Sequence, residues 1–338
     1  MIIVMKRNAD EKHIEHVIEH VKKISLNPVP LHGTERTVVA VLGDERDVDQ
    51  MRISAMPGVD KVMAVLNPYK LSGRETKKEN TVINLGDNVT IGGDELSIMA
   101  GPCGIESAAQ TEAAARAVKA SGAKILRGGA FKPRTSPYSF EGLGEEGLKI
   151  MHDTAKRHNL KTITEIVDIR DVEVIDKHVD MFQVGARNMQ NFNLLKEVGS
   201  TNKPILLKRG MSATIKELLL AAEHIMSKGN PNVALCERGI RTFETETRNT
   251  LALATVPLVK ELSHLPIIVD PSHATGKPSL IGPMSKAAIA AGADGIIVEV
   301  HPNPEEALSD ADQALTPAMF DSIMHELKPI ADAVGRAL

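Results

Sequence analysis

The sequence predicts an α/β protein, a (β/α)8 TIM barrel preceded by a small α+β domain. The chain has 338 residues, too many for one ordinary domain but enough for a barrel of about 250 residues and a small module. From residue 96 onward, eight apolar runs alternate with amphipathic segments, as strands and helices do in a parallel α/β fold. A polar segment separates this part from the first 66 residues.

The first 66 residues alternate short apolar runs with amphipathic segments in the order β-α-β-β-α-β, which is the split βαβ pattern. Apolar side chains recur at helical spacing in the first expected helix: Ile14, Val17, Ile18 and Val21. Its charged side chains then fall on the opposite face. We therefore expect a compact α+β domain over residues 1–66.

Residues 67–80, NPYKLSGRETKKEN, are polar and contain Pro, Gly and a cluster of charges, which predicts a linker. The segments TVINLG and NVTIGG then flank Gly86 and Asp87, a signal for a β-hairpin. We expect this hairpin to begin the catalytic domain, residues 81–338.

The eight expected strands are LSIMAG, KILRGG, KTITEI, MFQVGA, PILLKR, NVALCER, PIIVDP and GIIVEV. The segments between them predict helices over 107–120, 144–158, 214–228 and 283–291, with a last helix near 317–337. Apolar strands joined by helices indicate parallel strands that are buried on both faces. Eight such repeats favour a closed barrel over the alternative, a doubly wound open sheet.

The composition excludes several kinds of partner. The chain has 40 Lys and Arg against 44 Asp and Glu, a net charge of -4, with 6 Phe, 2 Tyr and no Trp, so we expect no nucleic-acid partner. No apolar run is long enough to span a membrane, and the start becomes charged too early for a signal peptide, so we expect a cytoplasmic protein. Two cysteines in such a chain are no disulfide framework.

Charged side chains gather where the expected strands end, which is where barrel enzymes build their active sites. The cations at or just after these ends are Arg127, Lys132, Arg134, Arg187, Lys208, Arg209, Arg238 and Arg241. A single arginine is most often part of a surface salt bridge. Placed together on one rim of an acidic protein, these cations indicate an anionic, phosphorylated substrate.

A second set of polar residues has the chemistry of metal ligands, although it comes from separate loops and its spacing forms no motif. The set consists of Cys103, His273, Glu299 and Asp310. One thiol, one imidazole and two carboxylates suit Mn, Fe, Co or Zn better than Mg or Ca. Cys236 is interpreted as a buried apolar residue. His301 is either an outer-sphere neighbour of the metal or a loop residue.

Seven segments resemble 3-deoxy-D-arabino-heptulosonate 7-phosphate (DAHP) synthases: GPCGIES, LRGGAFKPRTSPYSFEGLG, QVGARNMQNFNLL, LLKRG, LCERGIRTFE, VDPSHATGK and IIVEVHPNPEEALSDADQAL. The resemblance runs through essentially the whole of residues 67–338. The first 66 residues are similar to the ferredoxin-like, ACT-type regulatory domain of one subgroup of this family.

The resemblance implies a metal-dependent condensation of phosphoenolpyruvate with erythrose 4-phosphate and water, giving DAHP and phosphate in the first step of the shikimate pathway of aromatic amino acid biosynthesis. It also implies feedback inhibition by tyrosine or phenylalanine through the N-terminal domain, and a homotetramer.

The residue roles follow from the motif match. The metal ligands would be Cys103, His273, Glu299 and Asp310. Phosphoenolpyruvate would be held by Arg127, Arg187, Lys208 and Arg238, and the aldose phosphate by Lys132, Pro133, Arg134 and Thr135. Within these sets, the resemblance implies catalytic roles for Cys103, Lys132, Lys208 and His273.

Three alternatives remain open at this stage. One is the related 3-deoxy-octulosonate 8-phosphate synthase, which uses arabinose 5-phosphate; the KPRTS segment and the N-terminal domain favour the four-carbon aldose by resemblance. Another is a Schiff-base aldolase centred on Lys208, although the nearby arginines favour a protonated lysine that binds anions. The third is a non-catalytic amino-acid sensor built on residues 1–66.

Overall fold

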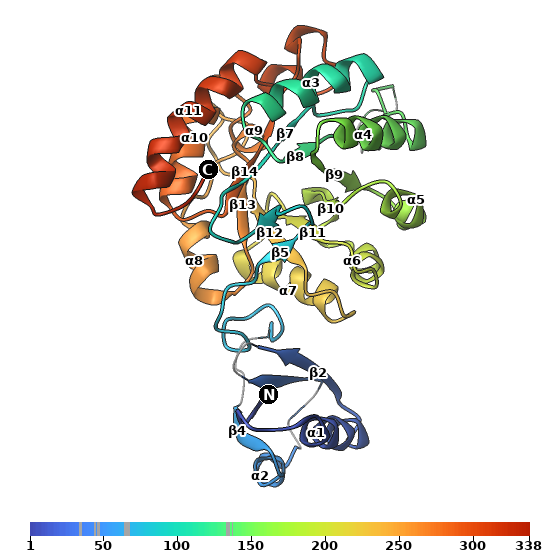
Figure 1. Cartoon of the computed structure of the whole chain (residues 1–338), viewed down its shortest axis with the longest axis vertical. Coiled ribbons are helices and arrows are strands. Elements are labelled where there is room, and N and C mark those ends of the chain that lie inside the picture. The colour runs from blue at the N-terminus through green and yellow to red at the C-terminus, as the bar shows by residue number, and fades with distance from the viewer. Residues whose placement is uncertain (34–35, 44, 46–47, 64–67, 133–135, 137) are drawn as a thin grey trace. The chain divides into compact units, whose positions relative to one another are not determined.

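The computed structural model divides the chain into two compact units, residues 1–80 with 261–264 and residues 81–260 with 265–338 (Figure 1). The structure describes the whole chain except residues 34–35, 44, 46–47, 64–67, 133–135 and 137.

The first unit contains a four-stranded antiparallel sheet in the order β2-β3-β1-β4. Its elements are β1 (Ile2–Met5), α1 (Glu11–Lys23), β2 (Asn27–His32), β3 (Thr37–Leu42), α2 (Gln50–Ser54) and β4 (Val59–Met63). This is the ferredoxin-like topology, and it confirms the β-α-β-β-α-β order expected from the sequence.

Helix α1 packs through the apolar stripe seen in the sequence. Val17 and Val21 are fully buried in the core of this unit, and Ile14 and Ile18 pack against it. Asp10 caps the helix by accepting a hydrogen bond from the backbone of His13, which satisfies an amide that has no partner within the helix.

The second unit is a closed barrel of eight parallel strands, as the sequence predicted, because β14 pairs with β7. The strands are β7 (Ser97–Gly101), β8 (Ile125–Arg127), β9 (Lys161–Ile166), β10 (Met181–Val184), β11 (Ile205–Lys208), β12 (Val233–Glu237), β13 (Ile267–Val269) and β14 (Gly295–Glu299). Parallel neighbours bring the C-terminal ends of all eight strands to one end of the barrel.

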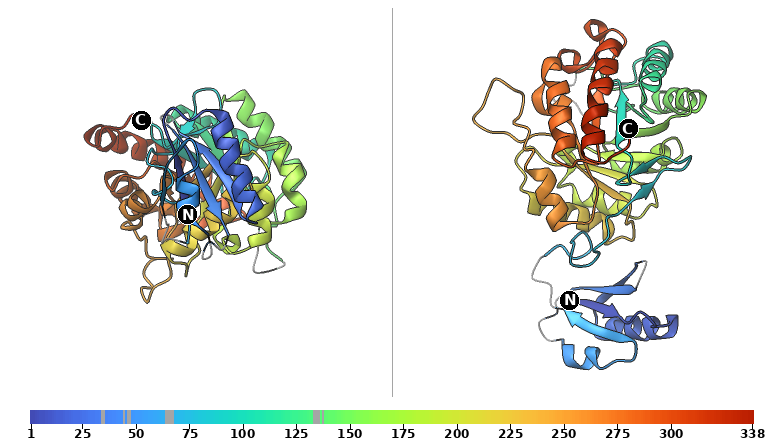
Figure 2. Two further views of the ribbon diagram at one scale, coloured as in Figure 1. Left: turned by 90° about the horizontal axis from the view of Figure 1, so that it is seen from below. Right: turned by 60° about the vertical axis from the view of Figure 1, so that its left-hand side comes forward.

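Helices follow the strands around the barrel, and Figure 2 (right) shows α10 and α11 side by side on its wall. They are α3 (Ala108–Ala120), α4 (Glu145–Arg157), α5 (Val172–Asp176), α6 (Phe192–Gly199), α7 (Ile215–Met226), α8 (Thr255–Leu262), α9 (Pro271–Thr275), α10 (Pro278–Ala290) and α11 (Pro317–Ala333). Among the described residues, no helix has the length and apolar character needed to cross a membrane.

The expected helix 283–291 begins earlier than predicted. Helix α10 starts at Pro278, in the first turn, where a missing backbone N–H costs no hydrogen bond,. Pro283 then lies inside the helix, although the sequence analysis had placed it at the start.

The hairpin flanking Gly86 and Asp87 is present as β5 (Ile83–Asn84) and β6 (Thr90–Ile91). Its buried Ile83 and Ile91 share one apolar cluster with barrel residues such as Met99 and Ile125, near the starts of their strands. The hairpin therefore extends the barrel core at the end opposite to the polar strand ends.

Candidate active site

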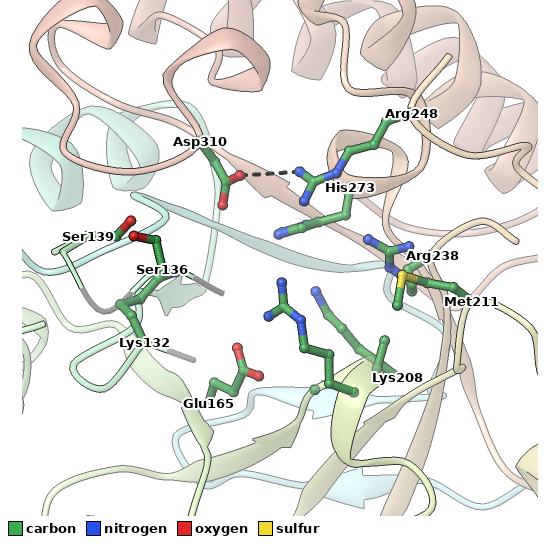
Figure 3. Close-up of a pocket in the computed structure, with 13 residues that line it drawn as sticks. Lys132, Ser136, Ser139, Glu165, Lys208, Met211, Arg238, Arg248, His273 and Asp310 are labelled. Carbon is green, nitrogen blue, oxygen red and sulfur yellow. Dashed lines mark hydrogen bonds and ion pairs between the residues drawn. The ribbon is translucent and has the colours of Figure 1, made fainter. Parts of the chain in front are cut away.

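A cavity of about 330 Å³ lies over the C-terminal ends of the barrel strands (Figure 3). It is lined by Lys132, Ser136, Ser139, Glu165, Gly185, Ala186, Arg187, Lys208, Met211, Arg238, Arg248, His273 and Asp310. Five of these residues are Lys or Arg and two are acidic, so the cavity is cationic although the chain as a whole carries a net charge of -4. Such a local excess of positive charge attracts anionic ligands.

Three of the four predicted metal ligands come together beside this cavity. The Sγ atom of Cys103 and one carboxylate oxygen each of Glu299 and Asp310 all lie within 4.8 Å of one another. Cys103 follows β7, Glu299 ends β14, and Asp310 lies in the loop that leads to α11. Barrel closure joins the first and last of these strands, and so brings together ligands that are about 200 residues apart in sequence,.

His273, the fourth predicted ligand, contacts this cluster through Glu299. Its Nε2 atom lies 3.3 Å from Glu299 Oε1, and its Nδ1 atom lies 2.7 Å from Asp270 Oδ2. The second distance is a close contact with a carboxylate that is fully buried. The imidazole thus has one nitrogen toward the ligand cluster and the other toward a carboxylate, the usual arrangement of a metal-binding histidine.

The donor set fits a transition metal or zinc. Ligands bound at about 2.0–2.3 Å lie roughly 3–4.5 Å apart, and the Cys103 Sγ to Asp310 Oδ2 distance is 3.0 Å. Burial and the nearby Glu299 carboxylate raise the pKa of the Cys103 thiol to about 12. Without a cation the thiol is therefore protonated and donates its hydrogen to Asp310, whereas a bound cation would stabilise the thiolate.

The predicted phosphoenolpyruvate ligands lie in different environments. Lys208 is buried and its Nζ atom lies 2.5 Å from Asp270 Oδ2. Arg127 is buried beneath the cavity, where it pairs with Glu299 at 2.9 Å and donates to the Pro102 carbonyl. Arg187 lines the cavity and is exposed.

Arg238 is the notable member of this set because it is buried and one of its nitrogens lacks a hydrogen-bond partner. The side chain is 5% exposed, and its Nη1 atom has no hydrogen-bond partner among the described residues. Burial lowers the pKa of Arg238, and the nearby Asp270 carboxylate offsets part of this shift. A buried guanidinium nitrogen without a partner beside a cavity can donate to an anionic ligand.

The predicted aldose-phosphate ligands are only partly described, since Pro133, Arg134 and Thr135 lie outside the described residues. Lys132 lines the cavity, and its Nζ atom donates to Cys103 Sγ at 2.8 Å. Figure 3 shows Lys132 with Ser136 and Ser139 on the side of the cavity away from Arg238 and Met211.

Three described cations of the predicted rim do not line this cavity: Arg127, which pairs with Glu299, Arg209 and Arg241. Arg209 is buried behind the strand ends, where it pairs with Glu237 and donates to Thr255 and the Ala213 carbonyl. Successive side chains along a strand point to opposite faces. Since Lys208 points into the cavity, Arg209 points away from it. Arg241 is exposed.

Sequence reasoning missed several residues of the site. Arg248 lines the cavity and lies 3.2 Å from Asp310, but its loop carries no recognisable pattern. Gln313 donates to Glu299 at 2.5 Å and accepts a hydrogen bond from Arg248 at 2.6 Å. Glu165, the second-last residue of β9, lines the cavity as well. Asp270 follows β13 and contacts both Lys208 and His273.

Gly185 allows Glu165 to reach the cavity wall. A Cβ atom at position 185 would lie 1.9 Å from Glu165 Oε1, which is far inside van der Waals contact. The glycine therefore leaves the space that the Glu165 carboxylate occupies at the end of β10.

His301 is buried and does not line the cavity. Its Nε2 atom lies 3.3 Å from Glu106 Oε2, and the other oxygen of Glu106 accepts a hydrogen bond from the Leu308 amide at 2.9 Å. Glu106 thus connects the loop after β7 to the loop that carries Asp310.

Two family models match the chain, the DAHP synthetase I family over residues 76–333 and the DAHP synthase ferredoxin-like domain over residues 1–67. The chain is 48% identical over 335 residues to phospho-2-dehydro-3-deoxyheptonate aldolase of Thermotoga maritima, which covers 99% of each chain. It is 30% identical to 2-dehydro-3-deoxyphosphooctonate aldolase of Koribacter versatilis, over 73% of this chain and 95% of the relative.

Solved structures show the same relation. The crystal structure of the Thermotoga maritima DAHP synthase superposes with a TM-score of 0.80 at 47% identity, covering 99% of this chain and 98% of that one. A truncated form of the Thermotoga maritima enzyme superposes with a TM-score of 0.75 at 47% identity and covers 80% of this chain and 98% of the truncated one. The chain therefore belongs to the DAHP synthetase I family of enzymes.

Proposed function

We propose that this enzyme condenses phosphoenolpyruvate with erythrose 4-phosphate and water to give DAHP and phosphate. The observation that carries the proposal is the contact between a thiol, imidazole and carboxylate cluster and a cationic cavity at one end of the barrel. Two phosphorylated substrates need such an excess of positive charge to be held close together.

Phosphoenolpyruvate binds on the side of the cavity formed by Arg187, Lys208 and Arg238. Its carboxylate and phosphate accept charge-assisted hydrogen bonds from these groups, and the unpartnered Nη1 atom of Arg238 supports this assignment. Arg127 lies deeper and holds Glu299 in place.

The aldose phosphate occupies the opposite side, near Lys132, Ser136 and Ser139. The adjoining residues Pro133, Arg134 and Thr135 complete this part of the site in the proposal. The two phosphates then lie apart, with the enol carbon and the aldehyde between them.

A divalent metal, Mn, Fe, Co or Zn, is held by Cys103, His273, Glu299 and Asp310 in this proposal. When bound, it supplies Lewis-acid polarisation of the aldehyde oxygen. Lys132 contacts Cys103 Sγ and so adds positive charge where negative charge develops on that oxygen.

The protein groups also account for the later steps. Attack by C3 of phosphoenolpyruvate on the aldehyde leaves positive character at C2, where water adds, and the resulting hemiketal phosphate expels phosphate. Glu165, on the cavity wall, accepts the proton released by the water. Arg187 and Arg238 stabilise the departing phosphate.

The ion pair of Lys208 with Asp270 at 2.5 Å supports a cationic role for this lysine. A Schiff-base lysine must present its amine to a carbonyl, whereas the Nζ atom of Lys208 is held against a buried carboxylate. Borohydride treatment with either substrate is therefore expected to leave the protein mass unchanged.

We further propose that residues 1–66 form a regulatory domain, joined by a linker at 67–80 to the catalytic residues 81–338. Tyrosine or phenylalanine is the proposed effector and a homotetramer the proposed assembly, both by family resemblance. Removal of residues 1–66 should leave catalysis and abolish inhibition. Inhibition that persists in the truncated chain would refute the assignment.

The test of the main proposal is a phosphate-release assay on chain treated with a chelator and reloaded with Mn, Fe, Co or Zn. We expect activity with erythrose 4-phosphate that requires the metal, and at most weak activity with arabinose 5-phosphate. A preference for arabinose 5-phosphate would assign the enzyme to the octulosonate reaction instead. Full activity in the chelated chain would refute the metal site.

A further inference from the structure

Asp270 is a buried carboxylate that lies between the two halves of the site. It follows β13 and is 0% exposed. Its Oδ1 atom accepts a hydrogen bond from the backbone N–H of His273 at 2.9 Å, so Asp270 caps the short helix α9. Pro271, the first residue of that helix, has a fixed φ angle that restricts the turn further.

The other oxygen of Asp270 faces two functional side chains at once. Oδ2 lies 2.5 Å from Nζ of Lys208 and 2.7 Å from Nδ1 of His273. The three-residue contact joins β11 to the turn after β13. Asp270 does not belong to the ligand cluster of Cys103 and the two carboxylates, so any effect that it has on chemistry passes through its neighbours.

The contact with His273 sets which nitrogen of the imidazole is available. A carboxylate beside Nδ1 favours the tautomer with its proton on Nδ1 and leaves the Nε2 lone pair free. Nε2 is the nitrogen that faces Glu299, at 3.3 Å. Asp270 therefore aims His273 at the ligand cluster.

The contact with Lys208 sets the position of a cation. Lys208 is 3% exposed, and a flexible four-carbon side chain has many alternative rotamers. The ion pair with Asp270 selects one of them, and Figure 3 shows the lysine extending into the cavity between Glu165 and His273. The ammonium group is thus already in place before an anion arrives.

We propose that Asp270 is a positioning residue that orients both the metal-binding histidine and the anion-binding lysine, so that one carboxylate serves both halves of the site. This inference rests on the proposed function, since it assumes that a divalent metal and phosphoenolpyruvate bind here. It follows that loss of the Asp270 charge weakens the binding of both, although Asp270 touches neither.

The test compares full-length Asp270→Asn with the parent chain and with Asp294→Asn. Asp294 is a matched control because it is equally inaccessible, at 2% exposed, and pairs with Lys260 and Arg336. It precedes β14 and so lies at the opposite end of the barrel. Both variants remove the charge of a buried, paired carboxylate.

Two affinities are measured without turnover. Co²⁺ affinity is determined by competition with a chromophoric chelator, and phosphoenolpyruvate affinity by calorimetry in the absence of aldose. For Asp270→Asn we expect Co²⁺ binding to weaken by about 10- to 100-fold, the usual effect of removing the partner of a metal-binding histidine. We expect phosphoenolpyruvate binding to weaken at least tenfold, and both affinities of Asp294→Asn to stay near those of the parent.

The outcomes separate this inference from the proposed function. If the parent binds neither Co²⁺ nor phosphoenolpyruvate, the proposed function fails, and this inference fails with it. If the parent binds both and folded Asp270→Asn keeps either affinity unchanged, the shared positioning role alone is overturned.

A second measurement covers the case in which Asp270→Asn does not fold, because removing one partner of a buried ion pair is strongly destabilising. Nitrogen NMR of the zinc-loaded parent, with the His273 signals assigned by their loss in His273→Asn, reports the tautomer directly. We expect the proton on Nδ1 and the metal on Nε2. A metal bound through Nδ1 would overturn the inference.

Discussion

Arg238→Met is expected to make the unliganded protein more stable and to weaken substrate binding. Arg238 is 5% exposed, and its Nη1 atom has no hydrogen-bond partner among the residues that the structure describes. The nearby Asp270 carboxylate is already occupied by Lys208 and His273. One nitrogen of the buried guanidinium group thus lacks a partner, and an anionic ligand would supply one,.

The size of the effect follows from this burial. A buried polar group without a partner costs about 1–3 kcal/mol, and methionine retains most of the apolar volume of the arginine side chain. The free energy of unfolding should therefore rise by about 1–3 kcal/mol, and the Tm by roughly 2–4 °C for each kcal/mol. Loss of charge-assisted hydrogen bonds worth about 3 kcal/mol should weaken phosphoenolpyruvate binding roughly 100-fold.

Arg209→Met is the matched control. Arg209 is 7% exposed and adjoins the same strand ends, but it is fully paired with Glu237, Thr255 and the Ala213 carbonyl. Its loss leaves Glu237 buried without its ion-pair partner, which should cost about 3–5 kcal/mol,. Calorimetry without ligand gives the Tm of both variants, and phosphoenolpyruvate titrations give their affinities. These measurements test whether Arg238→Met raises the Tm and weakens binding. A Tm for Arg238→Met that falls as far as that of Arg209→Met would refute the reasoning.

Three further predictions concern other parts of the molecule. Cys103→Ser should weaken Co²⁺ binding by at least about 100-fold and remove the thiolate charge-transfer band; an unchanged absorption spectrum would show that Cys103 is no ligand. Gly185→Ala should lower kcat at least tenfold with little change in Co²⁺ affinity, because its Cβ would lie 1.9 Å from Glu165 Oε1; unaltered kcat would leave Glu165 without a catalytic role. Burial lowers the pKa of His264 from 6.5 to about 4. Between these pH values the folded state therefore binds fewer protons than the unfolded state. About 3 kcal/mol of stability should be lost as the pH falls through this range. Denaturant midpoints at pH 7.5 and 4.5 measure that loss, and His264→Gln should reduce it; an equal loss in the variant would contradict the assignment to His264.

Most of the architecture could be read from local sequence patterns. The apolar runs of β7 to β14 and the apolar stripe of α1, with Val17 and Val21, indicate which faces are buried. This pattern can be read from the sequence because it involves residues only a few positions apart. The eightfold repeat then predicted the barrel. The start of α10 was misplaced because a proline is favoured in the first turn of a helix. Both Pro278 and Pro283 could have marked that turn, and the structure shows that Pro278 does.

The candidate ligands could be named because strand ends in a barrel converge at one rim. Cys103, Glu299 and Asp310 do lie together. Their proximity could be predicted without knowing any side-chain positions, because the first and last strands of a closed barrel pair with each other. The sorting of the rim cations was beyond this rule, since Arg209 turns to Glu237 behind the barrel rim whereas Lys208, its neighbour in sequence, faces the cavity.

The alternation of strands and helices, and the chemical types at the strand ends, are properties of the linear chain because they arise from spacing and composition. The contacts between side chains within the site are not determined by the linear chain in this way. Asp270 meets Lys208 across 62 residues, and Arg248 meets Asp310 across 62 residues, through loops whose paths depend on packing rather than on periodicity. Whether a buried charged side chain has all its partners, as Arg209 does, or keeps one nitrogen without a partner, as Arg238 does, follows only from the folded structure. The physical reason is that electrostatic energy depends on distance and burial in space.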